Sequence, residues 1–263
     1  MSIAPFEFSP GSTPLLISVP HAGRELPEEL QPRLCAEGLA QPDTDWHVPR
    51  LYDFARELGV GFLVAKLSRY VIDLNRDPDG AALYPGADNT ELCPASSFAS
   101  RPLYRDAEAP RAEEIEARRR QYFDPYHRTL REELTRLRAK HGFAVLLDAH
   151  SIRSELPRFF PGKLPDLNLG SANGRSAPPE LERLAYATLA QAQRYTAVLN
   201  GRFQGGYITR RYGQPESGWF ALQLEIAQCA YLDEAAPERF DATRAAELMA
   251  LLRRFVTQLL DWR

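Results

Sequence analysis

Short apolar segments, each bounded by proline, glycine or polar residues, recur along the chain and are typical of buried strands. The segment 14–20 (PLLISVP) lies between two prolines, and 143–147 (FAVLL) follows a glycine. Four further segments have the same character: 61–66, 70–74 (YVIDL), 196–199 and 220–226 (FALQLEI). The pattern therefore predicts six strands.

Longer segments carry apolar residues at intervals of three and four, the spacing of a helix with one buried face. In 49–58, a proline near the start is also typical of a helix N-terminus. The segment 110–140 is expected to be helical, with Pro125 either breaking or restarting it and Gly142 ending it. Two more helices are predicted at 179–193 and 241–262. Strands that alternate with helices favour an α/β fold with a mixed, largely parallel sheet flanked by helices.

Three segments between these elements are predicted to be loops. The segment 78–98 is rich in proline, glycine, aspartate and asparagine, and 154–178 and 205–218 also lack a strand or helix pattern. Long loops in a compact domain are usually functional or disordered, so 78–98 and 154–178 are candidates to cover a site. No repeat, low-complexity tract or linker divides the chain, and we expect residues 1–263 to form a single domain.

The composition excludes several classes of function. A formal net charge of −3 gives no electrostatic basis for binding nucleic acid or an anionic membrane. Three cysteines, none in a CxxC pair, form neither a disulfide framework nor a thiolate zinc site. The N-terminus lacks the pattern of a signal peptide, and no segment has the length and apolarity of a membrane span. We therefore expect a cytoplasmic protein, with its oligomeric state left open by the sequence.

Three polar residues lie at or near the ends of predicted buried strands: His21, His150 and Glu225. Functional sites of open α/β sheets gather at the carboxyl ends of the strands. Two imidazoles and one carboxylate are the ligand set of many catalytic zinc sites, with a fourth position left for water. A single histidine at such a place is more often a hydrogen-bonded structural residue, but the three together favour a metal site.

A second polar motif, Asp73-Leu-Asn75-Arg76, follows another predicted strand. The planar guanidinium of Arg76 matches a carboxylate or a polarised carbonyl, and the neighbouring amide of Asn75 can bind the same group. Arg69, shortly before, is a further candidate for substrate binding, and a supporting partner of the site or a surface residue are the alternatives. The alternative interpretation is a salt-bridged turn at the surface.

Four motifs resemble the N-formylglutamate amidohydrolase family, an enzyme of one histidine-degradation route. They are PHAG at 20–23, SRYVIDLNRDP at 68–78, LLDAHS at 146–151 and GGYITRRYGQPESGWFALQLEIAQCAYLDE at 205–234. The resemblance runs from about residue 13 to about residue 234 with the motifs in order. The family is itself similar to zinc carboxypeptidases and aspartoacylase, so the resemblance implies a zinc-carboxypeptidase-like fold and hydrolysis of a small anionic N-acyl amino acid.

The resemblance also implies roles for individual residues. His21 and His150 would be metal ligands, and Glu225 would be the base that activates water. Asn75 and Arg76 would bind a substrate carboxylate or polarise the scissile carbonyl. The metal would be Zn²⁺ or another divalent ion such as Co²⁺ or Mn²⁺, because a site of histidine and carboxylate ligands accepts several metals.

The third metal ligand departs from the peptidase pattern. The position three residues after the first histidine, a glutamate in the peptidases, is Arg24, and Glu25 follows one residue later. The segment Asp43-Thr-Asp45-Trp-His47 offers other ligands, of which we favour Asp45. The alternative interpretation is that the two aspartates cap the helix predicted next.

Arg210 and Arg211 follow two glycines on a predicted flexible loop and would suit an anionic substrate. A solvated basic pair is the alternative. Two other functions compete with hydrolysis of N-formylglutamate. One is a related metal-dependent hydrolase or carboxypeptidase with another substrate, and the other is a non-catalytic protein that binds carboxylates. A serine hydrolase is disfavoured because the chain has no G-x-S-x-G elbow.

Overall fold

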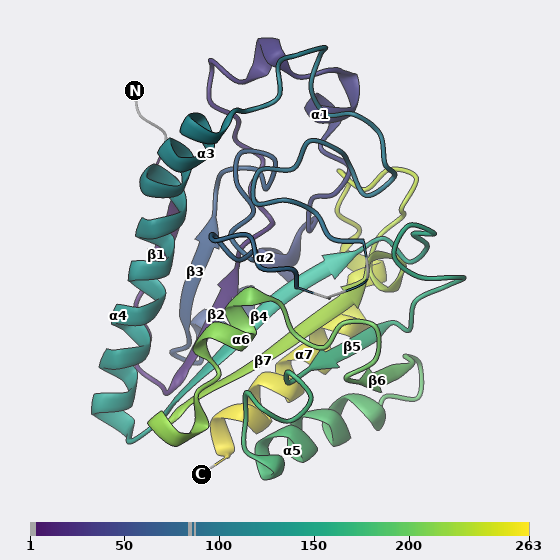
Figure 1. Ribbon diagram of the computed structural model, residues 1–263. Coiled ribbons are helices and arrows are strands. Elements are labelled where there is room, and N and C mark those ends of the chain that lie inside the picture. The colour runs from purple at the N-terminus through teal and green to yellow at the C-terminus, as the bar shows by residue number, and fades with distance from the viewer. Residues whose placement is uncertain (1–3, 84–85, 87, 263) are drawn as a thin grey trace.

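The computed structural model describes residues 4–83, 86 and 88–262, and the strands within these ranges form one mixed sheet (Figure 1). The strands are β1 (Phe6–Ser9), β2 (Leu15–Val19), β3 (Gly61–Ala65), β4 (Ala144–Ile152), β5 (Leu167–Gly170), β6 (Ala197–Leu199) and β7 (Trp219–Ala227). Their order in the sheet is β1-β3-β2-β4-β7-β5-β6. The central strands β3, β2, β4 and β7 are parallel, whereas β1 and β5 run antiparallel to their neighbours β3 and β7. The predicted mixed, largely parallel sheet is confirmed.

Helices cover both faces of this sheet (Figure 1). They are α1 (Ala36–Ala40), α2 (Val48–Leu51), α3 (Ala112–Arg118), α4 (Asp124–His141), α5 (Pro179–Ala190), α6 (Tyr207–Tyr212) and α7 (Ala242–Asp261). Helices α4 and α6 pack on one face in a common hydrophobic cluster, and α5 and α7 pack on the other. The α/β architecture flanked by helices follows the prediction. None of the described helices has the length and apolarity to cross a membrane.

Alternation along the central strands decides what each face of the sheet presents. In β7, Leu222 and Leu224 join the core beneath α5 and α7. Gln223 and Glu225 therefore point to the opposite face. In β4, Leu147 belongs to the same core as Leu222 and Leu224. Its neighbours Leu146 and Asp148 therefore point to the opposite face, on which α4 and α6 pack.

Some predicted strands and loops are wrong. The segment 70–74 is a series of buried turns, in which Asp73 donates its backbone N–H to the carbonyl of Leu92 (2.7 Å). Strand β4 continues past the predicted end at residue 147 to Ile152. The predicted loop 154–178 contains β5, and no sequence pattern pointed to the half-exposed edge strand β1.

The helix predictions also need correction in detail. The segment 49–58 forms the single turn α2 and a separate 3₁₀ turn, Asp53–Arg56, whose apolar side chains still face the core. The segment 110–140 is helical throughout most of its length, but a π-helical turn (Arg119–Phe123) joins α3 to α4. Pro125 neither breaks nor restarts the helix: it lies in the first turn of α4, directly after the π-helical turn, and the backbone on its N-terminal side stays helical. Gly142 ends α4 with φ 85°, as predicted.

Candidate metal and active site

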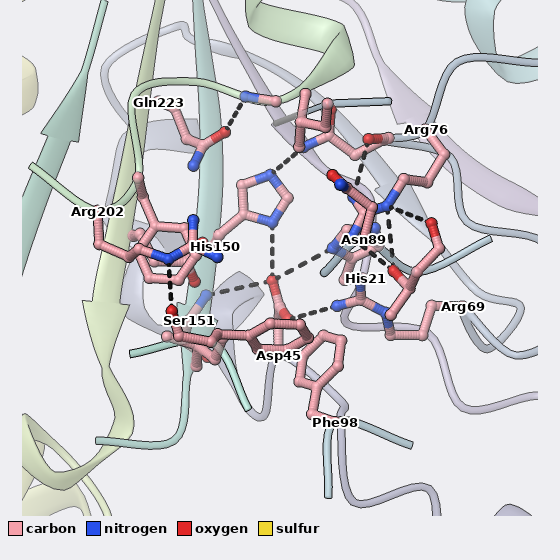
Figure 2. Close-up of a pocket in the computed structure, with 18 of the residues that line it drawn as sticks. His21, Asp45, Arg69, Arg76, Asn89, Phe98, His150, Ser151, Arg202 and Gln223 are labelled. Carbon is pink, nitrogen blue, oxygen red and sulfur yellow. Dashed lines mark hydrogen bonds and ion pairs between the residues drawn. The ribbon is translucent and has the colours of Figure 1, made fainter. Parts of the chain in front are cut away.

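A pocket opens at the carboxyl ends of β2, β4 and β7 and encloses about 600 Å³, part of it open to solvent (Figure 2). His21 lies just after β2, while His150 and Glu225 lie near the ends of β4 and β7. All three side chains line the pocket and are buried. The structure thus brings together the three strand-end residues that the sequence singled out.

The register of β4 and β7 places chemically active residues beside one another. His150 pairs with Glu225, and Asp148 pairs with Gln223, across these parallel strands. Because alternate residues of a strand share a face, all four side chains point to the face of the sheet that carries the pocket. The spacing D-x-H in β4 and Q-x-E in β7 therefore builds one wall of the site.

His21, Asp45 and His150 form a cluster in which one ligand atom of each lies within 4.8 Å of the others. The Nδ1 of His150 lies 3.0 Å from Asp45 Oδ2, and the Nδ1 of His21 lies 3.8 Å from the same oxygen. The cluster is buried and offers two imidazole nitrogens and a carboxylate. This donor set could hold a divalent metal ion.

Two further carboxylates orient the imidazoles. His21 Nε2 lies 2.7 Å from Asp73 Oδ1, and His150 Nε2 lies 3.1 Å from Asp148 Oδ2. Both aspartates are fully buried. An imidazole that donates one N–H to a carboxylate turns its other nitrogen toward a metal, an arrangement common in metal sites. Neither Asp73 nor Asp148 was predicted to take part in the site, although Asp73 lies two positions before Asn75 and Asp148 lies two positions before His150.

Asp45 is held in place by the backbone on either side of the cluster. Its own N–H donates to the carbonyl of His21 (3.0 Å), and its carboxylate accepts from the N–H of Ser151 (3.2 Å). Neither Asp43 nor Asp45 caps α2, whose N-terminus has no side-chain cap.

The other candidates for the third ligand lie outside the cluster. The carboxylate of Asp43 accepts hydrogen bonds from Tyr70 Oη (2.7 Å) and the backbone N–H of Phe98 (2.8 Å). The ring of His47 hydrogen-bonds a backbone carbonyl (2.9 Å), and Glu25 forms an ion pair with a lysine. Of the candidate ligands, the structure therefore brings only Asp45 to the two histidines.

Burial and neighbouring charges shift the pKa values of the pocket-facing groups. Burial raises the pKa of Glu225 to about 8, because the carboxylate loses its hydration inside the pocket. Burial also disfavours a charged His150, but Asp148 and Asp45 outweigh this effect and hold its pKa well above the usual range. Acidic groups thus surround a buried imidazole, which suits the site to a positively charged ligand.

Arg69 is a buried counter-charge beneath the cluster. Its Nη2 lies 2.6 Å from Asp73 Oδ2 and its Nη1 lies 3.8 Å from Asp45 Oδ1. Burial opposes ionisation of Asp73, yet Arg69 holds the pKa of that carboxyl well below its usual range. Burial and the charge of Arg69 lower the pKa of His21, which favours the neutral imidazole that binds metals. Arg69 thus places a buried positive charge beside Asp45 of the cluster and beside Asp73, which contacts His21.

Asn75 and Arg76 line the pocket and also hold its wall together. The amide oxygen of Asn75 accepts from the backbone N–H of Ile208 (2.7 Å), and its nitrogen donates to Asp148 Oδ2 (3.1 Å). Arg76 donates from Nη2 to Thr90 Oγ1 (2.7 Å). The two residues therefore join the turn after residue 73 to α6, to β4 and to the loop around Thr90.

The structure does not bring Arg210 and Arg211 to this pocket. They lie on α6, where a loop was predicted, and Ile208 and Tyr212 on the same helix are buried in the core. Arg210 donates to the carbonyls of Leu83 (2.5 Å) and Gly205 (3.0 Å), and Arg211 is exposed. Because Ile208 and Tyr212 occupy the buried side of α6, Arg210 and Arg211 face away from the core and line a separate hollow.

The glycine pair before α6 lets the backbone approach the sheet closely. The N–H of Gly206 donates to Gln223 Oε1 (2.6 Å). A Cβ at Gly206 would lie 2.4 Å from Asn75 Nδ2, so a larger residue cannot occupy this position without displacing Asn75. Gly205 has φ +113°, a conformation that favours glycine. Gln223 and Arg202 also line the pocket, and neither was predicted from the sequence.

Comparison with known proteins identifies close relatives. The family model for N-formylglutamate amidohydrolase matches residues 13–232. The chain is 51% identical over 255 residues to the N-formylglutamate deformylase of Pseudomonas aeruginosa, covering 97% of this chain and 96% of that protein. It is 48% identical to that of Pseudomonas putida, covering 97% and 95%. The crystal structure of N-formylglutamate amidohydrolase from Ralstonia eutropha JMP134 is similar, with a TM-score of 0.79, 28% identity and coverage of 97% and 98%.

Proposed function

The chain belongs to the N-formylglutamate amidohydrolase family, and we propose that it hydrolyses N-formyl-L-glutamate to formate and L-glutamate. The observation that carries this proposal is the buried cluster of His21, Asp45 and His150 beside Glu225, in a chain that matches the family from residue 13 to 232. By the same reasoning we place the enzyme at the end of a histidine-degradation route. We also propose a cytoplasmic location, which the three free thiols support.

We propose that His21, Asp45 and His150 hold a divalent metal ion, with Zn²⁺ as the first choice and Co²⁺ or Mn²⁺ as alternatives. The three buried donors fit such an ion, because their ligand atoms converge and a carboxylate orients each imidazole. When bound, the metal would supply Lewis acidity that polarises the acyl carbonyl and makes water a stronger acid.

Glu225 is the residue that moves protons in this proposal. It lines the pocket on β7, in register with the candidate ligand His150. Its carboxylate takes a proton from the attacking water and delivers it to the leaving nitrogen, so that the C–N bond breaks as formate and the free amine form. The role requires ionised Glu225, and a nearby cation would favour that form against the effect of burial.

Asn75 and Arg76 form the wall that receives the substrate α-carboxylate. Arg76 supplies the positive charge there, and its contacts with Thr90 fix the plane of the guanidinium. The same charge would stabilise negative charge that develops on the acyl oxygen. Arg69 is a positioning residue, since it contacts Asp45 of the cluster and Asp73, the carboxylate beside His21.

Release of formate from N-formyl-L-glutamate by the purified chain tests this proposal, with N-acetyl-L-glutamate and N-acetyl-L-aspartate as competing substrates. We expect the formyl substrate to have the highest kcat/KM. Faster cleavage of an acetyl substrate would instead assign the chain to a related N-acyl amino acid hydrolase. Binding of all three compounds without turnover would show a non-catalytic carboxylate-binding protein.

A further inference from the structure

Gln223 presents a hydrogen-bond donor to the pocket in a fixed orientation. The side chain is 3% exposed, and its Oε1 accepts the N–H of Gly206 at 2.6 Å. A backbone N–H can only donate, so the amide oxygen must face Gly206 and the NH₂ group must face the other way. Figure 2 shows this nitrogen directed into the pocket. No described residue accepts a hydrogen bond from it.

Arg202 brings a positive charge to the same side of the pocket (Figure 2). It lies between β6 and α6, and its Nε donates to the carbonyl of Phe159 at 2.8 Å. The guanidinium carbon lies 5.9 Å from the ring centre of Phe159 and 5.3 Å from that of Phe203. These rings lower the local dielectric constant, which strengthens any ion pair that the guanidinium makes.

The backbone that carries Arg202 is packed tightly against the sheet. A Cβ on Gly170, the last residue of β5, would lie 2.6 Å from the backbone carbon of Gln204. The N–H of Ala172 also donates to the carbonyl of Gln204 (2.6 Å). The segment next to Arg202 is therefore held at a defined distance from the strand.

The cations of the pocket stand on two opposite walls. In Figure 2, Arg76 and Arg69 lie on one side and Arg202 on the other, with His150 and Asp45 between them. Arg76 Nη1 lies 3.8 Å from Asp73 Oδ2, the carboxylate that orients His21. The α-carboxylate of an N-formyl amino acid is attached to the carbon next to the scissile nitrogen, so it reaches the wall nearest the cluster. A side-chain carboxylate, two methylenes farther out, reaches the opposite wall.

We infer that Arg202 and Gln223 bind the side-chain carboxylate of the substrate and set the preference for an acidic over a neutral side chain. A carboxylate accepts hydrogen bonds from both groups, and the charge of Arg202 makes one of them charge-assisted. An uncharged amide in the same place would present an NH₂ group to these donors and would lack the negative charge that the guanidinium attracts. The inference rests on the proposed hydrolysis of N-formyl-L-glutamate.

The test compares Arg202→Met with the unmodified chain on N-formyl-L-glutamate and N-formyl-L-glutamine, whose side-chain amide is neutral. We expect kcat/KM for the glutamate substrate to fall by about 30-fold or more, since one partner of a desolvated charge pair is lost. The value for the glutamine substrate should change by less than about threefold, so the ratio between the substrates collapses. An equal loss on both substrates, or no loss, would overturn the inference.

The α-amide of N-formyl-L-glutamate identifies which carboxylate Arg202 contacts. This analogue keeps the side-chain carboxylate, so Arg202→Met should lower its kcat/KM by about the same factor as for the parent substrate. Loss of the effect with this analogue would assign Arg202 to the α-carboxylate and contradict the inference. Arg175→Met is the matched control, because Arg175 also donates Nε to a backbone carbonyl (2.9 Å) but does not line the pocket.

Gln223→Glu separates binding by Gln223 from its structural contact. The variant keeps an oxygen for the N–H of Gly206 and replaces the pocket-facing donor with a second oxygen. We expect a folded protein with a raised KM for N-formyl-L-glutamate, and unchanged kinetics would contradict a binding role. If the unmodified chain releases no formate from any analogue, the proposed function itself fails. If it is active and Arg202→Met leaves the substrate ratio unchanged, only the present inference fails.

Discussion

Replacing Asp73 by asparagine removes a charge from the centre of the site with little change in size. In the structure, Asp73 Oδ1 contacts His21 Nε2 at 2.7 Å and accepts the N–H of Asn75 at 2.9 Å. An asparagine oxygen can keep both contacts. Its NH₂ group would then face Arg69 Nη2, which now lies 2.6 Å from Asp73 Oδ2, so two donors would oppose each other.

The effect on metal binding and the effect on folding have different sizes. Loss of a carboxylate that orients a metal-binding imidazole weakens metal affinity by about 10–100-fold, or roughly 1.4–2.7 kcal/mol at about 1.4 kcal/mol per tenfold change. Breaking the buried pair with Arg69 lowers the free energy of unfolding by about 3–5 kcal/mol in comparable cases. We expect the lower end, because Asp45 remains 3.8 Å from the same guanidinium.

Two measurements separate these effects. Competition with a chelator of known affinity gives the metal affinity of Asp73→Asn, and urea unfolding of the metal-free protein gives its stability. Asp148→Asn is the matched control, since Asp148 lies 3.1 Å from His150 Nε2 but pairs with no arginine of the described chain. It should lose metal affinity to a similar extent with a smaller loss of stability. Metal affinity within about twofold of the unmodified chain in both variants would refute the orienting role, because about 10–100-fold is expected.

Three further substitutions test other parts of the account. Glu225→Gln should retain the metal and lose about 10²–10⁴-fold in kcat, and near-normal formate release would remove Glu225 from proton transfer. Gly206→Ala should displace Asn75 and lower the free energy of unfolding by about 1–3 kcal/mol, with a fall in kcat/KM; unchanged urea unfolding and kinetics would contradict the close approach seen here. Leu252→Ala, at a fully buried position on the core-facing side of α7, should cost about 2–5 kcal/mol in urea unfolding. Under conditions in which the variant is folded, its kcat should be unchanged. A large loss of kcat would show that packing in this core determines the geometry of the site.

The central strands were predictable because their apolar runs are short and bounded by turn residues. The end of β4 was placed too early, at residue 147, because Asp148 and His150 are polar. The alternation that places Leu146, Asp148 and His150 on one face continues through the whole strand. A polar residue at a strand end is thus weak evidence that the strand has stopped when the polar face lines a site.

The segment 70–74 shows the opposite error. Tyr70, Val71, Ile72 and Leu74 are all buried, so the apolar pattern was correct about burial and wrong about conformation. Hydrophobic periodicity cannot distinguish a strand from a turn whose backbone N–H and C=O groups form local hydrogen bonds. Here the Asp73 carboxylate accepts a backbone N–H two residues ahead, a contact that replaces a strand ladder.

The sequence favoured Asp45 as the third candidate ligand without excluding its neighbours, and it gave no sign of the far wall of the pocket. The spacing Asp43, Asp45, His47 offers three donors, and only the hydrogen bond from Asp45 N–H to the His21 carbonyl shows which one meets the cluster. Arg202 belongs to no motif and reaches the pocket because the tight packing around Gly170 positions its segment. Contacts between distant loops carry no local pattern that a single sequence reveals.

The measurement that tests the central claim most directly is metal content and formate release on the same purified sample. Both are followed before chelation, after chelation and after return of Zn²⁺, Co²⁺ or Mn²⁺, with His150→Ala alongside. The account predicts that turnover of N-formyl-L-glutamate is lost with the metal, returns with it, and cannot be restored in the variant. Full turnover by the metal-free protein, or by His150→Ala without bound metal, would contradict it.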